Sequence, residues 1–173
     1  MFDFTSRLPL DRIVLGRHLM SPTAAYTPIA APVQRALTLV MSIKSPQAYQ
    51  ELKALLDQIQ GLPPDRNPVV LALNSLRNVH FARFVFLNNN TQLAVITTYD
   101  GTFEAYINEF IDAIGDVFNQ LLERMDGAPP LPVQKYRNAF LDYVRANDIP
   151  TVGTLYSAYP KATVLDIQTA MSS

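Results

Sequence analysis

Residues 79–125 read VHFARFVFLNNNTQLAVITTYDGTFEAYINEFIDAIGDVFNQLLERM, and this stretch decides the fold. It predicts an apolar strand at Val79–Leu87, a turn at Asn88–Asn90 and a second strand at Gln92–Tyr99. Beyond the second strand, apolar residues recur every three or four positions as far as Met125, a spacing that is typical of a long amphipathic helix. The stretch therefore predicts a β-hairpin that leads into a helix.

The flanking segments extend this pattern in both directions. Alternating apolar residues predict a first strand at 34–43, and Ser45 followed by Pro46 is typical of the start of a helix, which ends before Gly61. Downstream, apolar spacing predicts a helix between Val133 and Asn147, then a fourth strand at Val152–Tyr159 and a short helix after Thr163. The order β-α-β-β-α-β, with extra helices, predicts a ferredoxin-like α+β fold.

Two segments are harder to interpret from their pattern. Residues 1–32 contain four prolines, which exclude a long helix, so we interpret them as a proline-rich N-terminal arm with room for a helical turn around 11–20. The apolar run at 69–76 suits a helical turn or a strand, and we interpret it as a short helix or a loop. Residues 33–173 then form the ferredoxin-like domain.

The composition predicts a surface that needs covering. Hydrophobic residues make up 49% of the chain and charged residues 17%, below the ~25% of an average domain. Both faces of the two hairpin strands are largely apolar, whereas the helices of a ferredoxin-like sheet cover one face only. We therefore expect a homodimer in which a second copy covers the other face.

Charge and cysteine content exclude several classes of partner and site. The formal net charge of −1 gives no positive field for nucleic acid, so we expect no nucleic-acid partner. The 173 residues contain no cysteine, which excludes disulfides and thiolate metal sites. Because no apolar run reaches the ~18–20 residues of a membrane span, we expect a cytoplasmic protein without membrane insertion.

Three segments carry a family resemblance: VHFARFV at 79–85, TYDGTFEAY at 98–106 and LYSAYP at 155–160. Over roughly residues 33–170 the chain resembles stand-alone bacterial proteins of the dimeric α+β barrel superfamily, which includes dye-decolorising peroxidases, chlorite dismutases and antibiotic-biosynthesis monooxygenases. The resemblance implies a barrel built from two sheets. It implies no particular chemistry, because that superfamily includes haem enzymes, cofactor-free oxygenases and cyclases.

The resemblance does not imply a haem site in this chain. Haem-binding relatives supply an axial histidine from a helix, whereas the histidines here are His18 in the arm and His80 on a predicted strand. We therefore expect no cofactor and keep a haem-dependent, peroxidase-like protein as a further alternative.

The candidate catalytic residues are those that can move a proton near an apolar ligand. His80 is the first, because imidazole titrates near neutrality, and the phenols of Tyr99 and Tyr156 are the others. A packed histidine bonded to backbone, and tyrosines that serve as core residues, are the structural alternatives. The candidate substrate-binding residues are Arg83, Phe84, Tyr106 and Tyr159.

Two charged residues near the hairpin also have structural interpretations. Arg83 lies in an apolar row, so we expect it to pair with Asp100 or Glu104 rather than to bind an anion. It falls on the opposite strand face from His80 unless the strand carries a bulge. Asp100 is expected to cap the helix that follows it.

Two functions follow from these residues. The first is a small-molecule enzyme that carries out cofactor-free oxidation, isomerisation or cyclisation of an apolar, partly oxygenated metabolite, such as a polyketide or a lipid, in a pocket between the sheet and its helices. The second is a non-catalytic binding or partner protein that self-associates or accompanies a redox enzyme. An enclosed cavity that contains His80 or several tyrosine hydroxyls would favour the enzyme.

Overall fold

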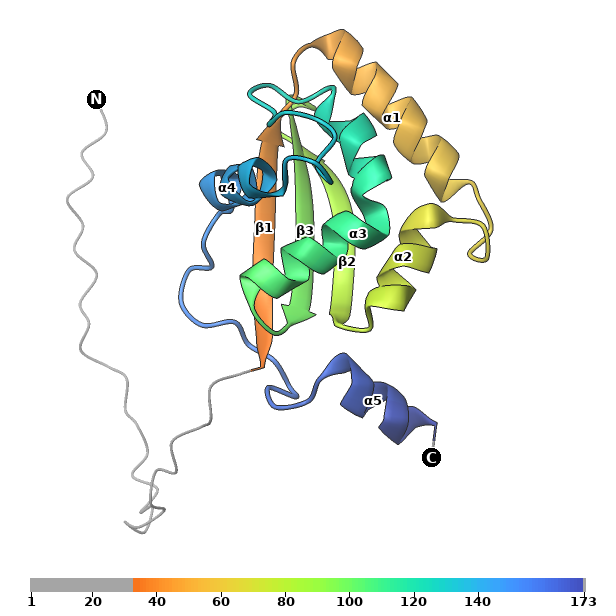
Figure 1. Cartoon of the computed structure of the whole chain (residues 1–173), viewed down its shortest axis with the longest axis vertical. Helices are drawn as coiled ribbons and strands as arrows, with labels where there is room; N and C mark the ends of the chain where they lie inside the picture. Colours follow the sequence, from red (N-terminus) through yellow and green to blue (C-terminus); the bar gives the residue numbers. More distant parts are fainter. Residues whose placement is uncertain (1–32, 173) are drawn as a thin grey trace, which may run out of the picture.

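The computed structural model describes residues 33–172 and shows an α+β chain in which three strands form one sheet (Figure 1). The predicted arm, with its turn around 11–20, lies outside the described residues. The elements are β1 (Gln34–Ser42), α1 (Pro46–Gln60), α2 (Pro68–Leu76), β2 (Val79–Leu87), β3 (Gln92–Asp100), α3 (Phe103–Leu122), α4 (Arg137–Asn147) and α5 (Val164–Met171).

The sheet has the order β1-β3-β2, and both pairs of neighbours are antiparallel. The β2–β3 hairpin turns at Asn88, Asn89 and Asn90, whose φ angles of 49°, 52° and 66° lie in the left-handed region. Asparagine tolerates this region better than most residues, which explains the run of three. The predicted hairpin is confirmed.

A bulge in β2 changes which side chains face the helices. The register shifts between Val79, opposite Tyr99, and Phe81, opposite Thr98. His80 is the extra residue of the bulge. Strict alternation predicted Val79 on the same face as Phe81, but the bulge places Val79 on the face that packs against the helices. From Phe81 onward the predicted alternation holds.

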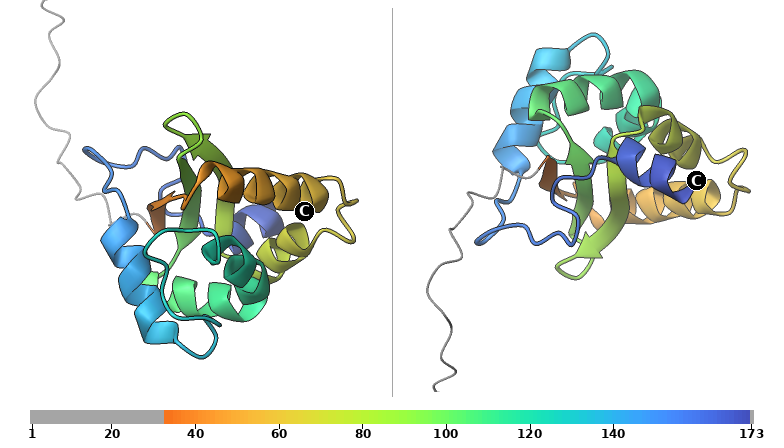
Figure 2. Two further views of the ribbon diagram at one scale, coloured as in Figure 1. Left: turned by 90° about the horizontal axis from the view of Figure 1, so that it is seen from above. Right: turned by 90° about the horizontal axis from the view of Figure 1, so that it is seen from below.

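The helices cover one face of the sheet and one of its edges. In Figure 1, α3 and α4 lie across the front of the sheet, α1 and α2 lie beyond its β2 edge, and α5 lies below the strand ends. The views from above and below show no described helix behind the sheet (Figure 2). The covered face is the apolar one expected of a core, and it carries seven buried residues: Leu37, Leu39, Met41, Leu93, Val95, Thr97 and Tyr99.

A chain of aromatic rings joins this face to the helices. Tyr99 stacks on Tyr106 of α3 with ring centroids 4.0 Å apart, and Tyr106 lies 5.8 Å from Phe110. Phe110 meets Phe118 edge to face at 4.6 Å, and Phe118 lies 6.0 Å from Phe140 of α4. Such contacts add to area burial and hold both helices against the sheet.

The predicted fourth strand is absent, which corrects the β-α-β-β-α-β order. Residues 151–159 form no strand; Val152 is fully exposed and Gly153 has a φ of 79°. The free edge of β1 bonds instead to the end of α4 and its continuation: the Thr38 amide donates to the Asp148 carboxylate (2.9 Å) and the Ile149 amide to the Thr38 carbonyl (2.9 Å). Pro150, which lacks an amide hydrogen, follows at once and limits further pairing.

The predicted helices after Ser45 and Thr163 are confirmed: Ser45 caps α1, and Thr163 with Asp166 forms a capping box at the start of α5. The 69–76 run belongs to the helix α2, whose first amides are capped by Asn67. Helix α4 ends at Asn147, as the apolar spacing predicts, but it begins at Arg137 rather than at Val133, because residues 133–135 form a turn.

Candidate functional site

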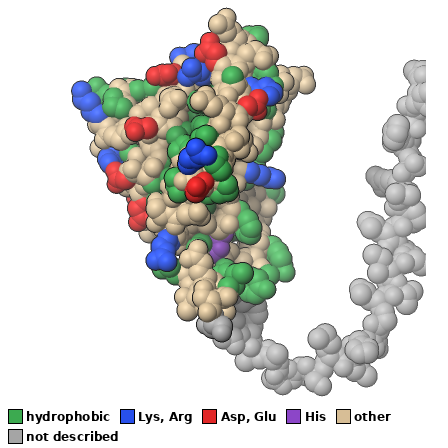
Figure 3. Space-filling model, turned by 90° about the vertical axis from the view of Figure 1, so that its right-hand side faces the viewer, with side chains coloured by type: hydrophobic (Ala, Val, Ile, Leu, Met, Phe, Trp, Pro, Cys, Tyr) green, Lys and Arg blue, Asp and Glu red, His purple; other side chains and the backbone are tan. Residues whose placement is uncertain are grey.

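A cavity of about 290 Å³ lies between the sheet and its helices, at the β2 edge. Helices α1, α2 and α3 supply most of its wall, and β2 and β3 supply the floor. Figure 3 shows the molecule from the side on which α1 and α2 lie. The apolar lining includes Leu56, Ile59, Leu73, Val95, Phe110 and Ile114.

Small side chains on the sheet account for this space. Ala82 of β2 lies opposite Thr97 of β3, and both residues line the cavity. The next cross-strand pair on the same face is the bulkier Phe84 and Val95, which bounds the space on one side. Because Ala82 is small and exposed, the space beside it is open to solvent at the β2 edge, where α2 does not cover it.

The buried polar groups of the cavity are largely satisfied by the protein. The Asn67 side chain accepts from the amides of Val69 (3.0 Å) and Val70 (3.2 Å) and donates to the Ile59 carbonyl (2.9 Å). The Thr97 hydroxyl accepts from the Tyr106 phenol at 3.1 Å, which leaves its own proton to donate. The buried part of the lining is therefore mostly apolar, with one hydroxyl donor at its floor, and the exposed Gln60 adds an amide at its edge.

Arg83 is the charged side chain at this cavity, and the predicted ion pair is wrong. Within residues 33–172, Arg83 is exposed and makes no ion pair or hydrogen bond. Glu104 bonds instead to Arg145 (2.7 Å), and Asp100 to His80 (2.8 Å). Because β2 is the outer strand of the sheet, a residue of its open-face row also reaches the cavity at the strand's free edge.

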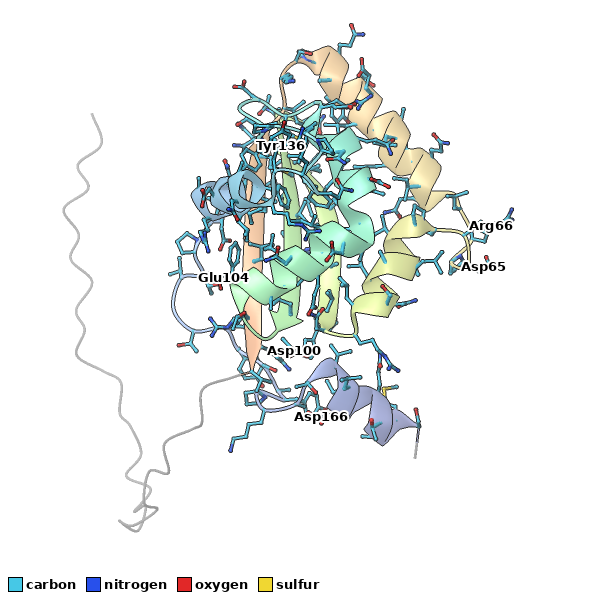
Figure 4. The ribbon with its side chains drawn as sticks, in the orientation of Figure 1. Asp65, Arg66, Asp100, Glu104, Tyr136 and Asp166 are labelled. Carbon is cyan, nitrogen blue, oxygen red and sulfur yellow. The ribbon has the colours of Figure 1, made fainter. Side chains whose placement is uncertain are left out.

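His80 and Asp100 form a buried pair that lies outside the cavity lining. Their side chains are 7% and 11% exposed, and His80 Nε2 lies 2.8 Å from Asp100 Oδ1. Asp100 Oδ2 accepts from the amide of Val164 (2.8 Å), the first residue of α5, and Figure 4 shows Asp100 at the sheet end above α5. The expected role of Asp100 as the cap of α3 is wrong, because Thr102 fills it. The pair joins the strand ends to α5.

The four candidate tyrosines divide into a buried pair and an exposed pair. Tyr99 is 3% and Tyr106 is 1% exposed; burial raises the pKa of Tyr99 and raises that of Tyr106 to about 12. Tyr156 and Tyr159 are 88% and 69% exposed on the segment before α5. The candidates therefore do not converge: Arg83 and Phe84 line the cavity, Tyr106 touches it through Thr97, and the other four candidates lie elsewhere.

Sequence reasoning missed the residues that make the cavity, above all Ala82, Thr97 and the α2 side chains. The signal that could have found the first two is the presence of small residues in otherwise bulky rows of the hairpin. The contribution of α2 depends on where that helix packs, which its own pattern does not specify.

The described lining of the cavity offers no axial ligand for a haem, and His18 lies outside the described residues. Axial ligation needs an imidazole facing a cavity, whereas His80, the described histidine, is bonded to Asp100 and does not line this one. Among residues 33–172, no group of histidine and acidic side chains is arranged to hold a metal ion. The described helices include none that is both long and apolar enough to cross a membrane.

The chain matches no protein-family model, no curated protein and no solved structure. Its function is therefore argued from its own geometry.

Proposed function

We propose that this protein is a non-catalytic binding protein for a small apolar molecule. The observation that carries the proposal is the cavity between α1, α2, α3 and the β2 edge, whose lining is mostly aliphatic and aromatic with a few polar groups. Cavities of this make-up, at ~300 Å³ and above, are the usual form of ligand sites.

Binding is favoured over catalysis because of what lines the cavity. Oxidation, isomerisation or cyclisation without a cofactor needs a group that can take up and release a proton within hydrogen-bond reach of the ligand. In the described part of the chain, the lining contains no histidine, tyrosine, lysine or carboxylate. The proposed catalytic residues His80, Tyr99 and Tyr156 lie outside it.

The test is whether blocking the cavity abolishes binding. Ala82→Phe adds a ring at the cavity, and Ala54→Phe is its control, because Ala54 of α1 is an exposed alanine, as Ala82 is, but does not line the cavity. In titration calorimetry with octanoate and 1-octanol, the wild type and Ala54→Phe should bind at least one of the two, and Ala82→Phe should bind neither. A wild type that binds neither compound, or an Ala82→Phe that binds normally, would refute the proposal.

The same proposal includes a dimer in which two copies of this three-stranded sheet pack through their open faces. The open face carries three apolar side chains of β2: Phe81 is 75% and Leu87 37% exposed, and Val85 is half-buried, with the charged Arg83 between Phe81 and Val85. The central strand adds the half-buried Ile96, whereas its Ala94 is fully buried. Exposed apolar side chains gathered on one sheet face favour association, and a second sheet packed on this face would cover them.

A further inference from the structure

We propose that the ligand of the cavity is a medium-chain monocarboxylate, with its carboxylate at Arg83 and its alkyl chain directed toward α3. This inference rests on the proposed binding function and adds the chemical class of the ligand. It is argued from the size of the cavity, the distribution of polarity along it and the unpaired charge at its edge.

The size of the cavity favours a small ligand. At about 290 Å³ it lies at the lower end of the ~300–1,000 Å³ range of small-molecule sites. Octanoate, with its eight carbon and two oxygen atoms, is a ligand of this class.

Polarity is distributed unevenly along the cavity. Phe110 and Ile114 of α3 are 6% and 3% exposed and offer no polar side-chain group, so they suit a hydrocarbon. At the β2 edge lie Arg83, and the outer backbone groups of a strand whose described partner is β3 alone. One end of the cavity therefore suits an alkyl chain and the other a hydrogen-bonding head group.

The proposed head group is an anion because the charge in the lining of the cavity is positive. Arg83 is the charged residue in the lining, and no acidic side chain of residues 33–172 pairs with it. Arginine binds carboxylates through two parallel N–H donors, and such bonds are about twice as strong as those between neutral groups. The Thr97 hydroxyl accepts from Tyr106 and keeps its own proton to donate within the cavity, so it supplies no charge.

The test compares octanoate with 1-octanol, which has the same chain length and no charge. Titration calorimetry at pH 7.5 and low salt should give octanoate about tenfold tighter binding, and Arg83→Gln should remove this preference while leaving octanol unchanged. Arg77→Gln is the control, because Arg77 is exposed, makes no ion pair among the described residues and does not line the cavity. It should keep the full preference.

Chain length gives an independent readout of the alkyl site. Hexanoate should bind about fourteenfold more weakly than octanoate, from the transfer of two methylenes, and dodecanoate should gain little more because the cavity is full. Equal binding of octanoate and octanol, or an Arg83→Gln that keeps the preference, would overturn the carboxylate assignment and leave the binding function standing. Failure of both compounds to bind the wild type would overturn both proposals.

Discussion

Two buried tyrosine hydroxyls, one with a hydrogen-bond partner and one without, should contribute with opposite sign to the free energy of unfolding. Tyr106 of α3 is 1% exposed, and its hydroxyl donates to Thr97 at 3.1 Å. Tyr143 of α4 has a buried hydroxyl with no hydrogen-bond partner in residues 33–172, and burial raises its pKa to about 12. Replacing each by phenylalanine removes the same single oxygen.

The two substitutions should change stability in opposite directions. Tyr106→Phe loses one hydrogen bond, worth about 1 kcal/mol net, and keeps the ring stacked 4.0 Å from Tyr99. Tyr143→Phe removes a desolvated, unpaired hydroxyl, whose burial costs roughly 1–3 kcal/mol, and should stabilise the fold by about 1 kcal/mol. The two variants should therefore differ by about 2 kcal/mol in the free energy of unfolding.

Urea denaturation followed by far-ultraviolet circular dichroism measures this difference, provided that the slope of the free energy against urea is the same for all three proteins. The thermal midpoint should fall by about 2–4 °C in Tyr106→Phe and rise by about 2–4 °C in Tyr143→Phe. Destabilisation of similar size by both substitutions would refute the reasoning, because it would show that the Tyr143 hydroxyl has a partner in the folded protein.

Three further results are expected. Burial raises the pKa of Tyr106 from 10.0 to about 12, so between these pH values the folded state keeps a proton that the unfolded state releases. About 3 kcal/mol of stability should therefore be present below pH 10 and be lost between pH 10 and 12. Urea denaturation across that range should show a smaller loss for Tyr106→Phe than for the wild type. Asp100→Ala leaves both His80 and the first amide of α5 unpaired, so it should lower the free energy of unfolding by about 3 kcal/mol. Hydrogen exchange should become faster in α5 than in α3, and unchanged exchange in α5 would contradict the anchoring role of Asp100. Phe81→Glu should shift sedimentation from dimer to monomer without loss of helicity, and an unchanged sedimentation coefficient would contradict the open-face dimer.

Most of the fold follows from local sequence signals. The hairpin, α1, α3 and α5 are each marked by a clear periodicity and by a cap or turn residue, such as Ser45 for α1 and Thr163 for α5. Helix α4 is marked by its periodicity alone, because Tyr136 at its start makes no capping bond. The prediction of a fourth strand was wrong for a physical reason. Residues 152–159 have the apolar content of a strand, but the β1 edge is engaged first by Asp148 and Ile149.

The candidate site was less predictable because it depends on tertiary packing. Sequence reasoning selected His80 for its chemistry, but a one-residue bulge and the nearby Asp100 place it in a structural pair. It selected Arg83 as a binding residue while expecting an ion pair that did not form, and the free charge is what marks the cavity edge. Ala82 carries no chemical signal, yet its small size opens the space.

The central claim is that the cavity holds a ligand, and methyl NMR tests it most directly. With octanoate added to the methyl-labelled full-length protein, nuclear Overhauser effects should join the alkyl chain to the methyl groups of Leu73 and Ile114, which line the cavity. The methyl groups of Ile96, on the open face of the sheet, should show none. Contacts confined to Ile96 and its neighbours on that face, or no contacts at all, would contradict the account.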